Sequence, residues 1–322
     1  MSILLRRREF IAALGGVAVW PLAARAQQHD GVRRIGILWS LLSVDESQPL
    51  LGAAFLSTAF IQGLQDLGWS QGGNLLIESR WALGDPNLRR SAEELVTFPL
   101  DALFAAGASA ATSLRQATRT LPIVFANVPD PVGAGFVESL ARPGGNMTGF
   151  ISIEYSQSTK WLELLKQIAP EVKRVAVLGA VVGGAGPAQF AAIQAVAPLF
   201  GVEVIPINVR AFAEIERAVT EFAHAPNGGL IVTVGSVVVG VDQHNPIIAL
   251  AAHHRLPTVY YDRAFVTEGG LICYGADVPD LYRRSASYVD RVLRGERPAD
   301  LPVQAPTKYE LVINLKTAKA AT

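Results

Sequence analysis

The sequence has little of the residue types on which several classes of protein depend. Its 322 residues include one cysteine, Cys273, so neither an intramolecular disulfide nor a thiolate metal cluster can form. Charged residues make up 17% of the chain, and 28 Lys and Arg balance 28 Asp and Glu. This lack of a basic excess argues against nucleic-acid binding. Because 50% of the residues are hydrophobic, the composition also excludes a disordered chain.

Motifs that carry catalysis or bind a cofactor are also absent. Residues 107–111 approach the pattern G-x-S-x-G of a nucleophilic serine, but Ala111 occupies the fifth position. We therefore predict that Ser109 is the N-cap of a helix and not a nucleophile. Residues 183–186 (GGAG) do not continue as a dinucleotide-binding loop, because Gln189 stands where the third glycine is needed. We expect neither enzyme activity nor a cofactor.

The five histidines do not suggest a metal site. His253 and His254 are adjacent, so on a helix their side chains point about 100° apart and cannot share one ion. The other three, His29, His224 and His244, are scattered along the chain. We therefore predict that the protein has no metal centre.

The first 26 residues have the organisation of an export signal. Arginines at residues 6–8 precede an apolar stretch over residues 10–24, and Ala24-Arg25-Ala26 supplies an A-x-A cleavage site. Residues 7–11 (RREFI) match the twin-arginine pattern, and an ordinary secretory signal that carries arginines is the alternative. We expect cleavage after Ala26 and a periplasmic mature protein.

Short apolar runs alternate with helical patterns through the rest of the chain. Four strand–helix units precede residue 149, and the same rhythm restarts at residue 159. Near-continuous apolar strands between helices predict parallel sheets that are covered on both faces. We therefore expect an α/β protein with two doubly wound parallel-sheet lobes. A multi-strand hinge would join them, because the C-terminal part of the chain passes between the lobes more than once.

The same patterns predict where each lobe begins and ends. The first lobe would comprise residues 33–148 and about 278–300, and the second residues 149–277 and about 307–322. Residues 131–140 are expected to form a short helix, with a proline in its first turn. Residues 142–149 (RPGGNMTG) have the composition of a loop.

Polar and aromatic residues follow the predicted strands, at the sheet edge where ligands of open α/β proteins bind. The candidates for a cleft between the lobes are Ser40, Ser109, Asn127, Asp130, Ser236, Tyr261, Asp262, Tyr274 and Asp277. Ser, Asn and Asp are also turn and capping residues, so a local structural role is an equal alternative for each of them. Together these residues would line a pocket for a small polar or zwitterionic molecule, with the two tyrosines as stacking faces.

Several stretches, taken in order, resemble one family of proteins. They are residues 7–11, 20–28 (WPLAARAQQ), 122–132 (PIVFANVPDPV), 142–149 (RPGGNMTG), 161–170 (WLELLKQIAP), 268–277 (EGGLICYGAD) and 301–319 (LPVQAPTKYELVINLKTAK). The chain resembles the substrate-binding proteins of ABC transporters, whose characterised relatives include the tryptophan- or tyrosine-binding type. This resemblance implies a periplasmic type I binding-protein fold, in which two lobes close over a ligand around a hinge.

The chain departs from these relatives in one wall of the expected pocket. Relatives often carry Asp-Pro and aromatic or basic residues after the strand that ends here at Val234. This sequence has residues 235–240 (GSVVVG) instead, so we expect a smaller and more apolar wall.

The leading hypothesis is a monomeric solute receptor that delivers a small ligand to the membrane permease of an ABC importer. The ligand would be amino acid-like or another small organic solute, and its contacts to both lobes would favour the closed state. No nucleic acid and no cofactor would take part. Two alternatives stay open: an extracytoplasmic ligand sensor, and an exported α/β hydrolase that uses Ser109.

Overall fold

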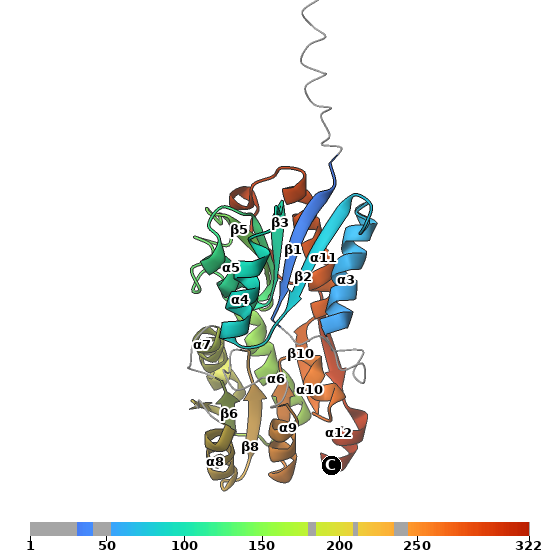
Figure 1. The fold of residues 1–322 in the computed structure, drawn as a ribbon. Coiled ribbons are helices and arrows are strands. Elements are labelled where there is room, and N and C mark those ends of the chain that lie inside the picture. Colours follow the sequence, from blue (N-terminus) through green and yellow to red (C-terminus); the bar gives the residue numbers. More distant parts are fainter. Residues whose placement is uncertain (1–30, 41–52, 180–184, 209–211, 235–243, 322) are drawn as a thin grey trace, which may run out of the picture.

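The computed structural model describes residues 31–40, 53–179, 185–208, 212–234 and 244–321. They form two α/β lobes arranged end to end (Figure 1). In each lobe, helices cover both faces of a sheet, and two apolar cores fill the space between them. None of the helices in the described ranges has the length and apolar character that a membrane crossing requires.

The sheet of the first lobe has five parallel strands in the order β2-β1-β3-β4-β5. The strands are β1 (Arg33–Trp39), β2 (Leu75–Trp81), β3 (Ala102–Ala106), β4 (Ile123–Val128) and β5 (Met147–Ile151). One face packs against α3 (Ala53–Asp66) and α11 (Val278–Leu293), and the other against α4 (Asp85–Leu95) and α5 (Ala108–Ala117). Because both faces are covered, the central strands are continuous apolar runs, as periodicity predicts.

The sheet of the second lobe has six strands in the order β11-β10-β9-β8-β6-β7. The strands are β6 (Arg174–Leu178), β7 (Glu203–Ile207), β8 (Gly228–Val232), β9 (Thr258–Tyr260), β10 (Ile272–Ala276) and β11 (Tyr309–Ile313). Its helices are α6 (Ser158–Ile168), α7 (Gly186–Val196), α8 (Phe212–Ala223), α9 (His244–His253), α10 (Arg263–Thr267) and α12 (Leu315–Ala321). Short 3-10 turns lie at η1 (Tyr155–Gln157), η2 (Ala197–Phe200) and η4 (Pro298–Asp300).

One strand departs from the predicted parallel arrangement. At the edge of the second sheet, β11 pairs antiparallel with β10, with Ile272 opposite Ile313 and Ala276 opposite Tyr309. The direction follows from the path of the chain, because β10 leads out of the second lobe into α11 and β11 brings the chain back. The other strands of both sheets are parallel.

The boundary expected between residues 148 and 149 falls inside β5, which pairs with β4 in the first sheet. Residues 147–149, expected as part of a loop, therefore begin a strand. Gly149 has a packing role there, because a Cβ atom would lie 1.9 Å from the carbonyl oxygen of Phe125. Sequence composition associates glycine with loops, whereas here its missing side chain permits close strand packing.

The short helix predicted over residues 131–140 is wrong, and this segment forms turns. A carboxylate oxygen of Asp130 accepts a hydrogen bond from the backbone N–H of Gly133 at 2.8 Å. Gly135 then takes a positive φ of 66°, which a right-handed helix does not contain. Local hydrogen bonding by an aspartate therefore prevails over the helical pattern.

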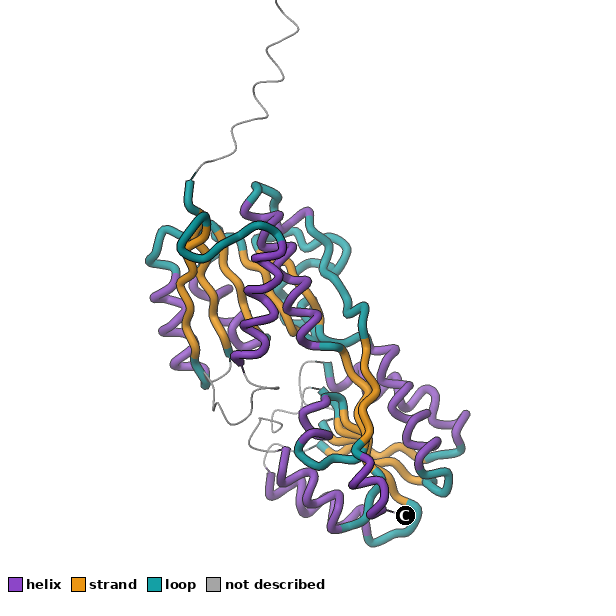
Figure 2. The backbone as a smooth tube through the Cα atoms, turned by 90° about the vertical axis from the view of Figure 1, so that its right-hand side faces the viewer, coloured by secondary structure: helices purple, strands orange, loops and turns teal. Residues whose placement is uncertain are grey.

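Three described segments connect the lobes: residues 152–157, residue 277 and residues 302–308 (Figure 2). The backbone of Gln304, in the third connection, bonds two residues of β5: its N–H donates to the carbonyl of Gly149 at 2.9 Å, and its carbonyl accepts from the N–H of Ile151 at 2.9 Å. The N–H of Asp277 donates to the carbonyl of Lys308 at 3.0 Å. The third connection is therefore bonded both to the second connection and to the end of β5, and does not act as an independent linker.

Candidate ligand-binding site

A cavity of about 290 Å³ lies between the carboxyl ends of the two sheets. The first lobe lines it with Ser40, Gly107, Ala108, Asn127, Pro129 and Val278. The second lobe and the connections line it with Ser152, Ile153, Gln157, Trp161, Val234, Tyr261, Asp262, Gly275 and Ala276. This volume is near the lower end of the roughly 300–1,000 Å³ typical of small-molecule sites.

The first-lobe wall begins where β1 and β3 end side by side. The Ser40 hydroxyl donates to the carbonyl of Ala106 at 2.7 Å, and the backbone N–H of Ser40 donates to the same oxygen at 3.1 Å. Gly107 follows β3 with φ of 99°, and a Cβ atom there would lie 2.3 Å from the Ser40 hydroxyl oxygen. A glycine is therefore needed for the serine to pack against the start of α5.

Helix α5 begins at Ala108, with Gly107 as its N-cap and without a side-chain cap. The prediction that Ser109 is the N-cap is therefore wrong, because Ser109 already lies inside the helix. Its carbonyl accepts a hydrogen bond from the Ser113 hydroxyl at 3.1 Å. The first N–H groups of a helix lack intrahelical partners and favour negative charge, so this end of α5 gives the cavity an electropositive backbone edge.

Asn127 supplies the second polar group of the first lobe. Its φ of 60° is in the left-handed region, which Asn tolerates better than most residues. The pairing of β4 with β5 is irregular between Phe125 and Val128, so the chain bends at this point. The Asn127 side chain is hydrogen-bonded to Tyr282 of α11, and burial raises the pKa of that tyrosine.

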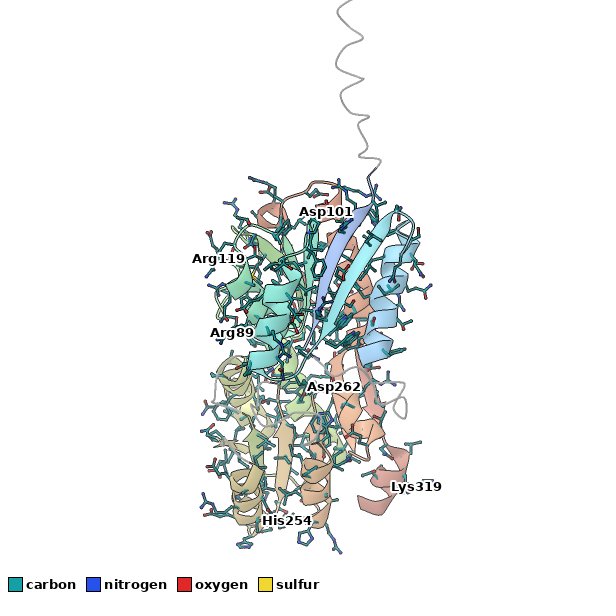
Figure 3. The ribbon with its side chains drawn as sticks, in the orientation of Figure 1. Arg89, Asp101, Arg119, His254, Asp262 and Lys319 are labelled. Atoms are coloured by element: carbon teal, nitrogen blue, oxygen red, sulfur yellow. The ribbon has the colours of Figure 1, made fainter. Side chains whose placement is uncertain are left out.

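On the opposite wall, Asp262 is the only charged side chain in the described lining. Figure 3 places it at the junction of the two lobes. One carboxylate oxygen accepts from the backbone N–H of Ala264 at 2.7 Å, so Asp262 is the N-cap of α10. Burial raises the pKa of Asp262, although the Ala264 amide, His244 and Arg263 act in the opposite direction. The site therefore holds a carboxylate that lacks much of its normal hydration.

Tyr261 and Gly275 complete the part of the wall next to this carboxylate. The Tyr261 ring meets Phe265 edge-on, with 5.7 Å between ring centroids, and burial raises the pKa of its hydroxyl. A Cβ atom on Gly275 would lie 2.1 Å from the carbonyl oxygen of Tyr261. Glycine at this position therefore allows β10 to approach the segment that carries Tyr261 and Asp262.

Four lining residues that the sequence analysis did not select come from the segment after β5: Ser152, Ile153, Gln157 and Trp161. The Trp161 indole N–H donates to the carbonyl of Tyr274 at 2.7 Å, and the Gln157 amide donates to the same oxygen at 3.5 Å. Ser152 directly follows a strand, so the search at strand ends would have found it if β5 had been recognised. The other three follow no strand, and no such signal points to them.

Four of the nine sequence-predicted residues border the cavity: Ser40, Asn127, Tyr261 and Asp262. Four others lie outside its lining, namely Ser109, Asp130, Tyr274 and Asp277. Ser236 lies outside the described residues, as does the departing segment 235–240.

The residues outside the lining have local partners. Asp130 accepts hydrogen bonds from the backbone N–H of Gly133 and from the hydroxyl of Tyr155. The pKa of Tyr155 is raised, mainly by burial and to a smaller extent by the nearby Asp130 carboxylate. The Tyr274 ring stacks on Tyr309 with centroids 5.8 Å apart. Asp277 accepts from the backbone N–H of Asp280 at 2.9 Å and is the N-cap of α11.

The arrangement does not resemble a hydrolase site. The described lining contains no histidine, and Ser109 does not border the cavity. Within the described ranges, no group of three His, Cys, Asp or Glu side chains is placed to hold a metal ion. Among the described residues that line the cavity, no nucleophile is paired with a general base.

A second cavity, of about 270 Å³, lies at the far end of the second lobe. Its lining includes Asn227, Gly228, His254 and Pro257, which lie near the amino ends of the strands. Figure 3 shows His254 at the end of the molecule distant from Asp262. Because ligands of open α/β sheets bind at the carboxyl ends of the strands, the cavity between the lobes is the better candidate.

Comparison with known proteins agrees with this geometry. The family model described as ABC transporter substrate binding protein matches residues 52–322. A tyrosine-binding protein of Clostridioides difficile is 28% identical over 268 residues, covering 81% of this chain and 74% of that protein.

Among the similar solved structures, two examples each match 90% of the chain with 25% sequence identity. One is an ABC domain from Streptococcus pneumonia in complex with L-Trp, with a TM-score of 0.77 and 94% of that chain covered. The other is a ligand-free, open substrate-binding protein from Clostridium difficile, with a TM-score of 0.72 and 95% covered. The predicted architecture, two α/β lobes of the type I periplasmic binding-protein fold, is confirmed. The chain belongs to the ABC transporter substrate-binding protein family.

Proposed function

We propose that this protein is the extracytoplasmic substrate-binding component of an ABC importer, and that it captures an amino acid-like ligand in the cavity between its lobes. The observation that carries the proposal is the lining of this cavity, which both lobes provide and which contains one carboxylate, Asp262. Export through the predicted signal at residues 1–26 and a monomeric state belong to the same proposal. The chain would bind and deliver the ligand without making or breaking a bond.

The chemistry of the lining supports a ligand that carries a positive charge. A desolvated carboxylate is stabilised most strongly by a cation that donates hydrogen bonds to it, and a primary ammonium group meets this requirement. On the other lobe, the start of α5 at Gly107 and Ala108 favours a negative group. A zwitterion such as an amino acid satisfies both walls at once.

The remaining lining supports an aromatic or apolar ligand side chain. The lining includes the apolar side chains of Trp161, Ile153 and Val234, and Tyr261 adds a ring. Aromatic side chains bury large apolar areas and stack on one another. Similarity to a tyrosine-binding protein and to an L-Trp complex points in the same direction.

Closure follows from contacts to both lobes. A ligand held by Asp262 on one wall and by the α5 end on the other binds the closed arrangement more tightly than the open one, and therefore shifts the population toward it. Delivery to a permease would then depend on the closed form. The division of the chain into two lobes around residues 152–157, 277 and 302–308 is the proposed basis of this motion.

The test is a thermal-shift and calorimetric screen of the mature chain with L-tyrosine, L-tryptophan and L-phenylalanine. Ligand at 100 times its Kd adds about 2.7 kcal/mol to stability, which raises the melting temperature by several degrees. N-acetyl-L-tyrosine, which lacks the ammonium charge, is the matched control and should give no shift. If the acetylated and free amino acids bind equally, the assignment of Asp262 to an ammonium group is wrong.

Transport is tested separately, in cells. Deletion of the gene should abolish uptake of the radiolabelled ligand that binds in vitro, and expression of the full chain should restore it. Normal uptake by the deletion strain would contradict the importer role while leaving ligand binding intact.

A further inference from the structure

The described residues contain a small set of buried polar side-chain atoms without a hydrogen-bond partner. They are Trp39 Nε1, Ser152 Oγ, Gln157 Oε1, Ser158 Oγ, both amide atoms of Gln189, and Glu268 Oε2. Buried polar groups in proteins are nearly always hydrogen-bonded, so each exception calls for an explanation. Two of these atoms, on Ser152 and Gln157, belong to residues that line the cavity between the lobes.

Gln157 is held in a defined position by its surroundings. Only 8% of its surface is exposed, and it lies in the η1 turn, where its backbone N–H donates to the Glu154 carbonyl at 3.0 Å. Its side-chain amide faces the carbonyl of Tyr274 at 3.5 Å. A reversed amide would place its oxygen against that carbonyl, so Nε2 must face Tyr274 and Oε1 is the atom left without a partner. Gln157 borders the cavity, and this oxygen is the acceptor that it leaves unpaired.

The surroundings of this acceptor differ from those of Asp262. Trp161 lies one helical turn after Gln157 and donates to the same Tyr274 oxygen, so the indole and the carboxamide are neighbours. Trp161 is fully buried, and Ile153 in the same segment is 3% exposed. A neutral acceptor in apolar surroundings suits a neutral O–H or N–H donor on an otherwise apolar group, whereas an ammonium charge is better matched by Asp262.

We propose that Gln157, assisted by the Ser152 hydroxyl, determines specificity by accepting a hydrogen bond from the side chain of the bound ligand. The preferred substrates are then amino acids whose side chains combine an apolar body with one neutral donor, such as a phenol or an indole. Side chains made only of hydrocarbon would leave the Gln157 oxygen unpaired in the complex. This inference rests on the proposed function and specifies the substrate class of the same cavity.

The test uses two pairs of probes that differ by one donor. L-tyrosine is compared with L-phenylalanine, and L-tryptophan with 1-methyl-L-tryptophan, by titration calorimetry with the mature chain. Sites built to hydrogen-bond a hydroxyl reject the analogue that lacks it, so we expect the donor-bearing member of at least one pair to bind at least about 10-fold more tightly. In Gln157→Leu this ratio should fall close to one, mainly through weaker binding of the donor-bearing probe.

Gln189→Leu is the matched control. Gln189 is also fully buried with an unpartnered amide, but it lies on α7 and does not border the cavity. Its substitution should leave the binding ratio unchanged. Ser152→Ala is a second, smaller change at the cavity, and it can be measured if Gln157→Leu does not fold. Ser158→Ala is its control, because the Ser158 hydroxyl is also unpartnered but does not border the cavity.

The outcomes separate this inference from the function on which it rests. If the wild-type chain binds both members of each pair equally, or if Gln157→Leu and Ser152→Ala keep the full ratio, Gln157 does not determine specificity while the receptor function stands. An equal loss of the ratio in Gln189→Leu would overturn the inference in the same way. If none of the four probes binds, the proposed amino acid ligand is wrong, and the inference falls with it.

Discussion

The wall that the first lobe contributes to the cavity consists of backbone and short side chains, whereas the second lobe contributes a carboxylate and large rings. Ser40 and Asn127 of the first lobe are already bonded within their own lobe, to Ala106 and Tyr282. Asp262 keeps a carboxylate in the cavity although one of its oxygens caps α10. Under the proposed function, the second lobe would discriminate between ligands, and the first would complete the enclosure.

Both walls nevertheless contain a glycine that allows close packing of the backbone. Gly107 on the first lobe and Gly275 on the second each occupy a place where a Cβ atom would collide, with the Ser40 hydroxyl at 2.3 Å and with the Tyr261 carbonyl at 2.1 Å. Each glycine follows or lies within a strand that ends at the cavity. The two walls therefore have a similar backbone, and they differ in the side chains that follow the strands.

Asp262→Asn should have the largest effect on ligand binding. Loss of one partner from a buried charge pair costs about 2–5 kcal/mol, so we expect affinity for L-tyrosine or L-tryptophan to fall by roughly 30-fold or more. Asn still caps a helix, and the variant removes a desolvated charge, so the unliganded protein should melt a few degrees higher. Calorimetric titration and thermal melting measure the two effects.

Asp277→Asn is the control for this variant. Asp277 is likewise an N-cap with a carboxylate that accepts a backbone N–H, but it lies outside the cavity lining. Its substitution should leave affinity within about 2-fold of the wild type. A comparable loss of affinity in both variants would show that capping, and not charge in the cavity, controls binding.

A smaller effect is expected from pH. The described ionisable neighbours of Asp262 are Tyr261, His244, Arg263, Cys273 and Glu310. Because burial raises the pKa of Asp262, a proton competes with the ligand ammonium at a higher pH than it would for an ordinary carboxyl near 3.9. Affinity should therefore be constant above the pKa of Asp262 and decline as the pH falls through it, by at most about 10-fold per pH unit.

This pH dependence distinguishes the two walls, since the first-lobe lining contains no ionisable side chain among the described residues. In Asp262→Asn the acid-side decline should disappear. Persistence of the decline in that variant would assign the titration to a group other than Asp262.

Ser40→Ala should have the smallest effect. The hydroxyl donates to Ala106, and the backbone N–H of Ser40 bonds the same oxygen, so the turn keeps one of its two hydrogen bonds. A neutral hydrogen bond contributes about 0.5–1.5 kcal/mol, so affinity should fall by less than roughly 10-fold. A loss as large as that of Asp262→Asn, measured by the same titration, would break the proposed difference between the lobes.

The elements that the sequence predicts well are those whose pattern repeats over many residues. Periodicity predicts a strand over residues 102–106 and an amphipathic helix over residues 281–293. The structure has the strand with these bounds, and it begins the helix three residues earlier, at Val278. Prediction from periodicity fails where a single residue determines the local structure. Gly149 has the composition of a loop but permits strand packing, and the carboxylate of Asp130 stabilises a turn where a helix was predicted.

The sequence predicted those residues of the candidate site that lie at strand ends, and it missed those in the connection between the lobes. Ser40, Tyr261 and Asp262 follow strands, and Asn127 is the last residue but one of β4. The rule for parallel sheets places all four at the carboxyl ends of the strands. Gln157 and Trp161 lie in a connection and in the helix after it, and their place beside the cavity depends on how the lobes are joined. Periodicity describes one element at a time and carries no information about that junction.

The amino-acid sequence by itself determined the class of fold, because alternating buried strands and amphipathic helices can satisfy their apolar faces only in covered parallel sheets. It also determined which polar residues end the strands. Only the tertiary structure decided which of them meet, since the cavity forms where two lobes approach across connections that are bonded to one another. Contacts between residues more than a hundred positions apart, such as Trp161 with Tyr274, arise from that approach and leave no local pattern in the chain.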